Sequence, residues 1–598
     1  MQYAKVYVLT KTNQLDGFYY YKIPAKLLPY IKKYSLVMVA FANFKKKALV
    51  AEIVKNVPSE IKENLKSIVK IIYNFGILDD RHLYICKQLS LYYLNNFGQL
   101  LELIIPEISK KTKNIIYKTD YKIVKRSYNK YLILDKLSNR QNNYLKIIKK
   151  TFDNNKSAML ILPDLDASKA FIQKCNKIFK NVAVFDKRQS IETKTTNWQK
   201  TFGKKILIIG TRNAIFRVPN DLGTIIIHQA NHIGHKQQNN VYFHTLDVAD
   251  IISQITGANI FIGQNIEYPN DFGQYKLIKN NFSYFKNTKF VLLNKHYEHI
   301  SPRIKSIIKT NINKKQKLLI IAHQTGESAG LICSDCKNIL YCERCESIEK
   351  KISDTKKQCP KCKIISNIPL ACPVCKSTNI SKFGETAKNI YDKLSSYYKD
   401  KVQFLINTND KLEGNVIVAT KYLISYNTAE FDNTVIVDWD SFNNGSSLDQ
   451  SFHALDDLFF IASFTKNYIY IQTKNTEDEK LFLLSGKKIK QYYKNELMLR
   501  KNYNLPPYKK IIKIHTKDKD RDIASKKITK LRNDIANIIS IKYLSILEGQ
   551  KIRNKFHFSL IIKTDHDKYV IFHKKLKDNY KKLKLSLYQI DINPLSLV

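Results

Sequence analysis

Residues 333–345 read CSDCKNILYCERC, and CPKC follows at 359–362 and CPVC at 372–375. Each C-x-x-C turn directs two thiolates at one centre, and two such turns complete a closed tetrahedral zinc site. The spacing therefore predicts a compact module folded around two Zn²⁺ ions per chain, with a structural role. The four pairs are Cys333 and Cys336, Cys342 and Cys345, Cys359 and Cys362, and Cys372 and Cys375.

Two other uses of clustered cysteines stay open at this point. Disulfides are disfavoured because the first residues, MQYAKVYVLTKTNQLDG, contain no apolar leader segment. Iron–sulfur ligation also uses four thiolates, so the spacing alone does not exclude it. The remaining cysteines, Cys86 and Cys175, stand alone in helix-like apolar contexts and are expected to be buried thiols.

The length and charge of the chain limit its class. A chain of 598 residues is too long to fold around a single hydrophobic core, so roughly three to five domains are expected. Lys and Arg number 100 against 52 acids, a formal charge of +48. A surface this basic attracts polyanions, and nucleic acid is the commonest of them. The alternative explanation is that a genome rich in A/T codons supplies many of the lysines. The apolar runs are too short to span a bilayer, so a cytoplasmic protein without a membrane partner is expected.

Periodicity divides the N-terminal part of the chain. The segments KVYVL, YYYKIP, LVMVAF and ALVAEIV alternate like short strands and predict a small β-rich module. Residues 81–105 then take helical spacing. Residues 110–131 hold eight basic residues, one acid and four tyrosines. That stretch is either a solvated linker or a small basic element whose tyrosines stack on bases.

From residue 136 onward, strand-like runs alternate with amphipathic segments. MLIL (159–162), VAVF (182–185), KILIIG (205–210) and TIIIH (224–228) favour an α/β lobe with a largely parallel sheet. A second set, from FVLL (290–293) to YIYIQT (468–473), predicts a second lobe that the cysteine window interrupts. After residue 476 a mixed α+β tail includes KIIKIHT and FSLIIKT.

These residues resemble the primosomal protein N′ (PriA) family of replication-restart helicases nearly end to end. YYYKIP and VMVAF are similar to the family's DNA-binding barrel, GTRNAIF to its first helicase lobe, and LEGQKIRNKFHFSLIIK to its C-terminal domain. The resemblance implies a multidomain α/β protein with two RecA-like helicase lobes. Its expected parts are an N-terminal β-rich DNA-binding domain with a following helix (1–105), a basic linker or reduced winged-helix element (106–135), lobe 1 (136–288), lobe 2 (289–475) with a two-zinc insert (330–380), and an α+β C-terminal domain (476–598).

The family pattern also implies which cysteines share a metal. The two sites are nested in the family. On that pattern Cys333, Cys336, Cys372 and Cys375 hold one zinc, and Cys342, Cys345, Cys359 and Cys362 hold the other.

The chain departs from the family where nucleotide would bind. The family has a glycine-rich phosphate loop ending in Gly-Lys-Thr between the first strand and helix of lobe 1. Here SNRQNNYLKIIKKTF leads almost directly into SAMLILPDL, so the loop and its helix are expected to be deleted. The Gly-Lys pairs at 203–204 and 486–487 lack the following Ser or Thr and the upstream glycine.

Other motor motifs are replaced as well. The family's acidic box is absent, although Mg²⁺ needs carboxylate oxygens, and no arginine occurs between Ser441 and Leu499, where the family's arginine finger is expected. The residues that stand at the acidic box and the two coupling motifs are His228, Gln229, Ala230 and Asn231; Gly263, Gln264 and Asn265; and His323, Gln324, Thr325 and Gly326.

The N-terminal pocket has changed too. In the family a Phe-Asp-Tyr run and a glycine receive a DNA 3′ end, and the residues at those positions here are Tyr19, Tyr20, Tyr21 and Tyr34. Tyrosines can still stack on bases. The expected DNA contacts are Tyr19, Tyr20, Tyr21, Lys45, Lys46, Lys47 and the Lys110–Lys130 stretch.

We therefore expect a DNA-binding pseudo-helicase: a replication-restart scaffold for forked or single-stranded DNA with an inactive motor. No catalytic or nucleotide-binding residue is predicted, and other replication or primosome proteins are expected partners. The alternative is an active ATP-dependent 3′–5′ primosomal helicase with an unrecognised nucleotide site. A third interpretation is a protein-interaction or RNA-binding module that has left replication.

Overall fold

A computed structural model describes residues 2–9, 17–109, 112, 120–238, 241–280, 288–294, 300–322, 330–383, 386–405, 412–420, 430–443, 447–478, 481, 489–539 and 543–597. The chain forms two compact units. The first comprises residues 1–264, 271–280 and 570–592, and the second comprises residues 265–270, 281–569 and 593–598.

The N-terminal domain is an antiparallel sheet in the order β2-β1-β4-β3-β5. Alternating apolar residues put one face of each strand into a common core, which includes Val6, Val37 and Val50. The predicted β-rich module is therefore confirmed. Its elements are β1 Tyr3–Val8, β2 Tyr19–Lys22, η1 Ala25–Tyr30, β3 Leu36–Phe41, β4 Phe44–Val54, α1 Ser59–Lys62 and β5 Ile68–Tyr73.

Two helices, α2 Asp80–Tyr93 and α3 Phe97–Ile104, follow the sheet. Asp79 caps α2 and is buried between Arg81 and His82. Burial opposes ionisation, but the charges and hydrogen bonds of His82 and Arg81 outweigh it and hold the pKa of the Asp79 carboxyl below its usual range. Arg81 donates to the Pro219 carbonyl at 2.9 Å, and His82 Nε2 donates to the Phe216 carbonyl at 3.0 Å. These bonds fasten α2 to the first α/β lobe.

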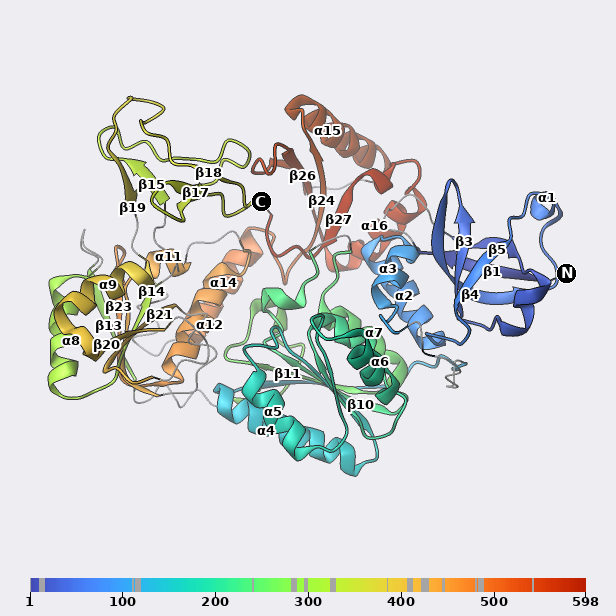
Figure 1. Cartoon of the computed structure of the whole chain (residues 1–598), viewed down its shortest axis with the longest axis horizontal. Coiled ribbons are helices and arrows are strands. Elements are labelled where there is room, and N and C mark those ends of the chain that lie inside the picture. Colours follow the sequence, from blue (N-terminus) through green and yellow to red (C-terminus); the bar gives the residue numbers. More distant parts are fainter. Residues whose placement is uncertain are drawn as a thin grey trace. The chain divides into compact units, whose positions relative to one another are not determined.

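Seven of the described strands form the parallel sheet of lobe 1, in the order β12-β6-β11-β10-β7-β9-β8. Helices α4 and α5 pack on one side of this sheet and α7 on the other (Figure 1). The strands are β6 Lys130–Leu134, β7 Ser157–Ile161, β8 Val182–Phe185, β9 Leu207–Gly210, β10 Leu222–His228, β11 Asn259–Gln264 and β12 Lys276–Asn280. The helices are α4 Leu137–Asp153, α5 Lys169–Ile178, α6 Ile191–Lys200, η2 Arg212–Phe216, η3 Ile233–His235, α7 Thr245–Thr256 and η4 Pro269–Asp271.

The expected deletion of the first helix of lobe 1 is wrong. Strand β6 pairs with β11 and β12, and α4 follows it before β7 begins. Tyr144 and Ile148 of α4 are buried in the lobe core at helical spacing. The strand and helix of the motif are thus retained, and only the loop between them has changed. The expected boundary at residue 136 also falls after β6, the strand that belongs to this sheet.

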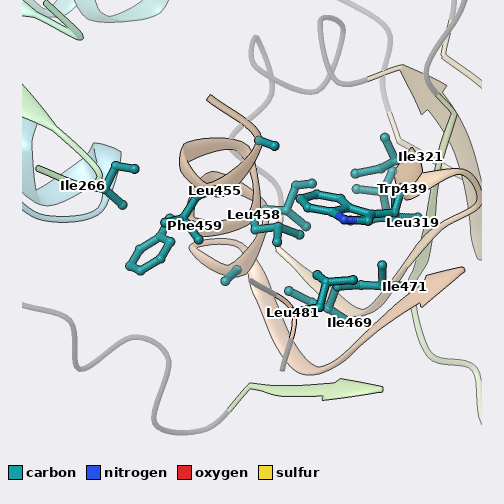
Figure 2. Packing of buried hydrophobic residues seen from close by; sticks show 14 of the residues in the cluster. Ile266, Leu319, Ile321, Trp439, Leu455, Leu458, Phe459, Ile469, Ile471 and Leu481 are labelled. Carbon is teal, nitrogen blue, oxygen red and sulfur yellow. The ribbon is translucent and has the colours of Figure 1, made fainter. Parts of the chain in front are cut away.

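Lobe 2 is a second parallel sheet, in the order β13-β23-β22-β14-β21-β20. Figure 2 shows Leu458 of α12 facing Trp439 and the apolar side chains of β14 and β23, with Leu455 and Phe459 on the other side of the helix. The strands are β13 Lys289–Asn294, β14 Leu318–Ala322, β20 Val402–Phe404, β21 Val416–Thr420, β22 Phe431–Ile436 and β23 Thr465–Thr473, and the helices are α8 Pro302–Asn313, α9 Ala387–Tyr398, η6 Lys399–Lys401, α11 Trp439–Asn443 and α12 Gln450–Ala462.

The cysteine-rich insert leaves lobe 2 after β14 and returns before α9. It consists of short antiparallel strands: β15 Gly330–Cys333, β16 Lys350–Lys351, β17 Lys356–Gln358, β18 Ile365–Asn367 and β19 Ile380–Phe383.

The predicted α+β tail follows lobe 2, and its strands β25, β26 and β24 are antiparallel neighbours. Its elements are α14 Ile489–Asn502, β24 Lys510–Asp518, α15 Arg521–Ile538, β25 Tyr543–Glu548, β26 Phe556–Thr564, α16 His566–Asp578, η7 Leu585–Leu587 and β27 Gln589–Ile592.

Candidate functional site

The eight clustered cysteines form two groups of four thiols. Within each group the sulfur atoms lie within 4.8 Å of one another. Neighbouring sulfurs are 3.5 Å apart for Cys333 and Cys375, 3.6 Å for Cys336 and Cys372, and 3.8 Å for Cys342 and Cys362. A tetrahedral zinc with Zn–S bonds of about 2.3 Å separates its sulfurs by about 3.8 Å, whereas a disulfide needs about 2.05 Å. The thiols therefore fit a metal ion and are not disulfide-bonded. The groups are Cys333, Cys336, Cys372 and Cys375, and Cys342, Cys345, Cys359 and Cys362.

All four C-x-x-C turns share one backbone geometry. The residue after the second cysteine donates its N–H to the carbonyl of the first, at 3.0 Å for Lys337, 2.7 Å for Glu346, 3.0 Å for Lys363 and 3.0 Å for Lys376. Each of these residues has a positive φ, between 52° and 64°. The turn also aims backbone N–H groups at the sulfurs. The N–H of Cys336 lowers the pKa of the Cys333 thiol to about 7, which favours the thiolate that a metal requires.

The two groups differ in burial. Cys336 and Cys375 of the first group are exposed, whereas Cys342, Cys345 and Cys359 of the second are buried. Ile364 and Ile552 pack against the second group. The isolated thiols Cys86 and Cys175 are buried in helices, as predicted.

The carboxyl edge of the lobe 1 sheet is where an α/β fold of this type binds nucleotide. Only Asp135 and Lys136 stand between β6 and α4. Asp135 is fully buried, and its Oδ1 accepts hydrogen bonds from the Lys136 N–H at 2.8 Å and from the Asn139 side chain at 2.9 Å. An acidic side chain therefore lies beside the first turn of α4, at the helix end where such a fold binds phosphate.

Buried side chains fill the adjoining space. Tyr144 of α4 hydrogen-bonds His228 Nδ1 at 3.0 Å, and its hydroxyl lies 1.7 Å from where a Cβ on Gly263 would stand. Arg140, in the first turn of α4, is also fully buried. Burial holds the pKa of His228 well below its usual range, so the imidazole is neutral.

The other residues at this edge are held by amide hydrogen bonds. The Gln264 side chain donates to Asp271 at 2.7 Å, and the Asn231 side chain donates to the same carboxylate at 3.2 Å and to Gln264 Oε1 at 3.1 Å. Asp271 is buried. Asn265 is buried, and Gln229 and Ala230 continue from β10. The expected motif at His323, Gln324, Thr325 and Gly326 lies outside the described residues.

The Gly-Lys pair that the structure describes, Gly203 and Lys204, does not form a phosphate loop. Gly203 and Lys204 lie in the turn before β9, which is the amino end of that strand. The pair at 486–487 lies outside the described residues. Arg500, the first arginine after Ser441, is buried and donates to Asp449 at 2.8 Å and to Glu496 at 2.8 Å. It is therefore a structural residue of α14.

The N-terminal tyrosines occupy different environments. Tyr19 and Tyr21 share one face of β2 and pack on the domain core, with Tyr21 buried and its hydroxyl donating to the Ala40 carbonyl at 3.0 Å. Burial raises the pKa of Tyr21 to about 12. The expected base contact therefore does not suit Tyr21, because period-two alternation turns it inward. Tyr20 lies on the opposite face, edge-on to Phe18.

Tyr34 has a φ of 64° and is buried, with its hydroxyl on Asp80. A left-handed backbone at this position suits glycine, the residue that the family resemblance led us to expect there. The side chain fills the position where glycine would leave space.

The expected lysine contacts lie on an exposed hairpin. Lys45, Lys46 and Lys47 are all exposed at the start of β4. Within the Lys110–Lys130 stretch, residues 110–111 and 113–119 lie outside the described residues. Tyr121 lies under the Arg81 guanidinium at 4.2 Å and bonds Asn220 at 2.6 Å, so its ring already has protein partners.

The sequence did not single out Phe44, Asp135, Arg140 or Tyr144. Phe44 could have been found from its place beside three lysines at a strand end. The other three lie in a stretch where the phosphate loop and its helix were expected to be deleted. Helical spacing of Tyr144 and Ile148 was the available signal.

Comparison with known proteins identifies the class of this chain. Residues 5–106 match the family model described as the 3′DNA-binding domain (3′BD) of PriA. With two α/β lobes after it, the match defines a multidomain protein with an N-terminal DNA-binding domain.

The full length of the chain is similar to proteins named replication restart protein PriA. The chain is 23% identical to that of Rickettsia prowazekii, over 94% of this chain and 95% of the relative, and 22% identical to that of Borreliella burgdorferi, over 90% and 92%. The Helicobacter pylori J99 protein is 22% identical over 72% of this chain and 75% of its own. The chain belongs to the PriA family.

Solved structures show a weaker similarity. The Pyrococcus furiosus Hef helicase domain aligns with a TM-score of 0.33 at 9% identity, over 60% of this chain and 95% of that domain. Nothing about function follows from a similarity at this level.

Within the described residues, no helix is long and apolar enough to cross a membrane.

Proposed function

We propose that this protein binds forked or single-stranded DNA during replication restart, as a scaffold whose helicase motor does not hydrolyse ATP. The family and the N-terminal domain support DNA as the ligand. The observation that carries the inactive motor is the buried Asp135 carboxylate at the N-terminus of α4. An acidic side chain stands there, where a phosphate cradle needs backbone N–H groups and a cation.

Two further features support the same proposal. The residues at the family's acidic box, His228 to Asn231, include no carboxylate to hold Mg²⁺. The buried Asp271 nearby already accepts from Asn231 and Gln264. In lobe 2, Arg500 is committed to Asp449 and Glu496, so it does not serve as an arginine finger. An arginine finger alone is worth about 10³–10⁵ in rate.

The test is phosphate release by purified full-length protein given ATP, Mg²⁺ and a synthetic fork. We expect no DNA-stimulated release above the level without protein. DNA-stimulated turnover that an Arg140→Ala change abolishes would restore the alternative, an active ATP-dependent 3′–5′ helicase with a nucleotide site at this edge.

The same preparation separates the scaffold from a module that has left replication. Affinity is measured for a fork, a single strand, a blunt duplex and an RNA strand at physiological salt. Preference for the fork and the single-stranded DNA supports the proposal. Equal affinity for all four would indicate charge alone, and preference for RNA would favour an RNA-binding module. Other replication or primosome proteins and a cytoplasmic location belong to the same proposal.

We also infer that each cysteine group holds one structural Zn²⁺. The sulfur separations match a tetrahedral four-thiolate site, and such a site has no open position for catalysis. Elemental analysis of the purified chain should find about two zinc ions per chain. Iron with a visible cluster absorbance would assign the groups to iron–sulfur ligation instead.

A further inference from the structure

The tip of the β3–β4 hairpin projects beyond the rest of the N-terminal sheet. Strand β1 pairs with β4 from Ala48 to Val54, the Lys47 carbonyl accepts the Leu9 N–H at 2.9 Å, and among the described strands residues 44–46 pair with β3 alone. Ala42 and Asn43 make the turn, with Ala42 at a φ of 47°. The result is a short two-stranded arm, defined here as residues 40–47.

The arm presents an aromatic ring among cations. Phe44 is 70% exposed, and its partner across the turn, Phe41, instead packs edge-on against Tyr19 in the domain. Lys46 Nζ lies 5.9 Å from the Phe44 ring centre, and Lys45 and Lys47 are exposed on either side along the strand. The arm contains no acidic residue. Leaving so large an apolar ring in water forgoes its burial energy.

We propose that Phe44 is a base-stacking residue for single-stranded nucleic acid, with Lys45, Lys46 and Lys47 contacting the flanking phosphates. A base offers a flat apolar face to Phe44, while the strand backbone offers the negative charge that the lysines need. Duplex bases are already stacked on each other, so the ring adds affinity for a single strand and none for a blunt duplex. This inference rests on the proposed DNA-binding function.

The arm differs from an end-capture pocket. A projecting hairpin touches a strand from the side and needs no terminus. Tyr21 and Tyr34, at the family's pocket positions, are buried. The arm therefore engages the interior of a strand, and a blocked 3′ end should not weaken its contact.

The first measurement uses a tryptophan probe. The chain has two tryptophans, Trp198 and Trp439, and both are buried. In the full-length Phe44→Trp variant the added emission reports the arm, and titration with an oligo(dT) strand should quench it. Tyr30→Trp is the matched control, because Tyr30 is 58% exposed in η1 of the same domain. Its emission should not respond.

The second measurement is affinity. Phe44→Ala should weaken binding to oligo(dT) about tenfold, the usual size of one base–aromatic contact, and Phe44→Tyr should restore it. An abasic strand of equal length removes the bases, so it should bind wild type and Phe44→Ala equally. Tyr30→Ala should leave affinity for oligo(dT) unchanged.

Three results separate the possibilities. If wild type binds oligo(dT) but Phe44→Ala binds it equally well, the stacking role is wrong and the proposed function stands. If Phe44→Ala weakens blunt duplex and abasic strand as much as oligo(dT), the effect is not stacking. If wild type binds neither fork nor single strand even at low salt, the proposed function itself fails.

Discussion

The backbone N–H of Arg553 donates a hydrogen bond to the sulfur of Cys345, at a nitrogen–sulfur distance of 3.3 Å. The next amide, that of Asn554, donates to the Arg344 carbonyl at 3.0 Å. Ile552 packs against the same cysteine group. The loop before β26 in the C-terminal domain is thus fastened to the second metal group, and N–H bonds to a ligand sulfur are the kind of contact that supports a metal site.

This relationship predicts that the two metal groups have different structural consequences. Cys345→Ser and Cys375→Ser each remove one thiolate, but only the first removes the acceptor of the Arg553 amide. In Cys345→Ser, peptides covering residues 549–556 should exchange deuterium faster, because a three-thiolate site loses affinity and the loop loses its anchor. Hydrogen–deuterium exchange by mass spectrometry measures this.

The control is Cys375→Ser. Cys375 belongs to the first cysteine group, whereas the loop at 549–556 is bonded to the second group. The variant should leave exchange at 549–556 as in wild type while it raises exchange around 333–338. Equal exchange at 549–556 in both variants would contradict the anchoring role.

The close approach of Tyr144 to Gly263 gives a stability prediction. A Cβ at Gly263 would lie 1.7 Å from the Tyr144 hydroxyl, so Gly263→Ala must displace a fully buried ring. We expect a loss of about 1–3 kcal/mol, the usual cost of overpacking. In a Tyr144→Leu background the same change should cost less, because the ring is gone.

Urea unfolding of the first unit measures this, with Trp198 fluorescence in a Trp439→Phe background as the signal. Gly549→Ala is the control, because its Cβ would meet its nearest neighbour at an ordinary 3.4 Å. If Gly263→Ala costs the same with and without Tyr144, the clash is not the cause.

The sequence predicted the strands of both lobes because apolar runs such as Ile206–Ile209 and Ile225–Ile227 are buried on both faces of a parallel sheet. The C-x-x-C turns were equally clear, because their geometry is local. The segment of β6 and α4 was missed for the opposite reason. Its loop lacks the glycines that mark the motif, and pairing of β6 with β11, from residues 259–264, is not a local property.

Site residues whose role depends on tertiary packing were also hard to predict. Tyr19, Tyr20 and Tyr21 read as one aromatic run, but strand alternation sends Tyr21 into the core. Asp135 occupies the phosphate position only because β6 and α4 meet there. Phe44 is 70% exposed at the turn of the β3–β4 hairpin, and the sequence does not state that this ring stays outside the core.

Two buried histidines, His228 and His235, and one partly buried histidine, His244, predict acid lability of the first unit. Burial lowers the pKa of His235 to about 3 and of His244 to about 3, and holds that of His228 well below its usual range. An unfolded histidine titrates near pH 6.5. These histidines bind protons in the unfolded chain but not in the folded one. The free energy of unfolding is therefore highest above about pH 6.5 and falls as the pH drops toward 3. Each histidine contributes up to about 1.4 kcal/mol per pH unit in that window.

His244→Asn isolates one of these groups. His244 caps α7 by accepting the Leu246 N–H at 3.2 Å, and asparagine is a good N-cap residue, so the cap survives without the titrating ring. The slope of unfolding free energy against pH between 5 and 6, read by Trp198 fluorescence, should fall by about one proton equivalent. His566→Asn is the control, because His566 lies in the second unit and Trp198 reports the unfolding of the first.

The exposed lysines of the arm predict a change in salt dependence. Each phosphate that a lysine neutralises releases counterions, and for single strands log K falls with log salt at about 0.7 per contact. Changing Lys45, Lys46 and Lys47 to Ala should therefore weaken binding to oligo(dT) and make that slope about 2 units shallower. Preference for fork over duplex should persist, because phosphates are common to both. Fluorescence anisotropy at several salt concentrations measures slope and preference together. The charge-matched control changes Lys309, Lys314 and Lys317, which are exposed on and after α8 in lobe 2. It removes the same three charges, so an equal loss of slope in both variants would mean that net charge, rather than the arm, binds the strand.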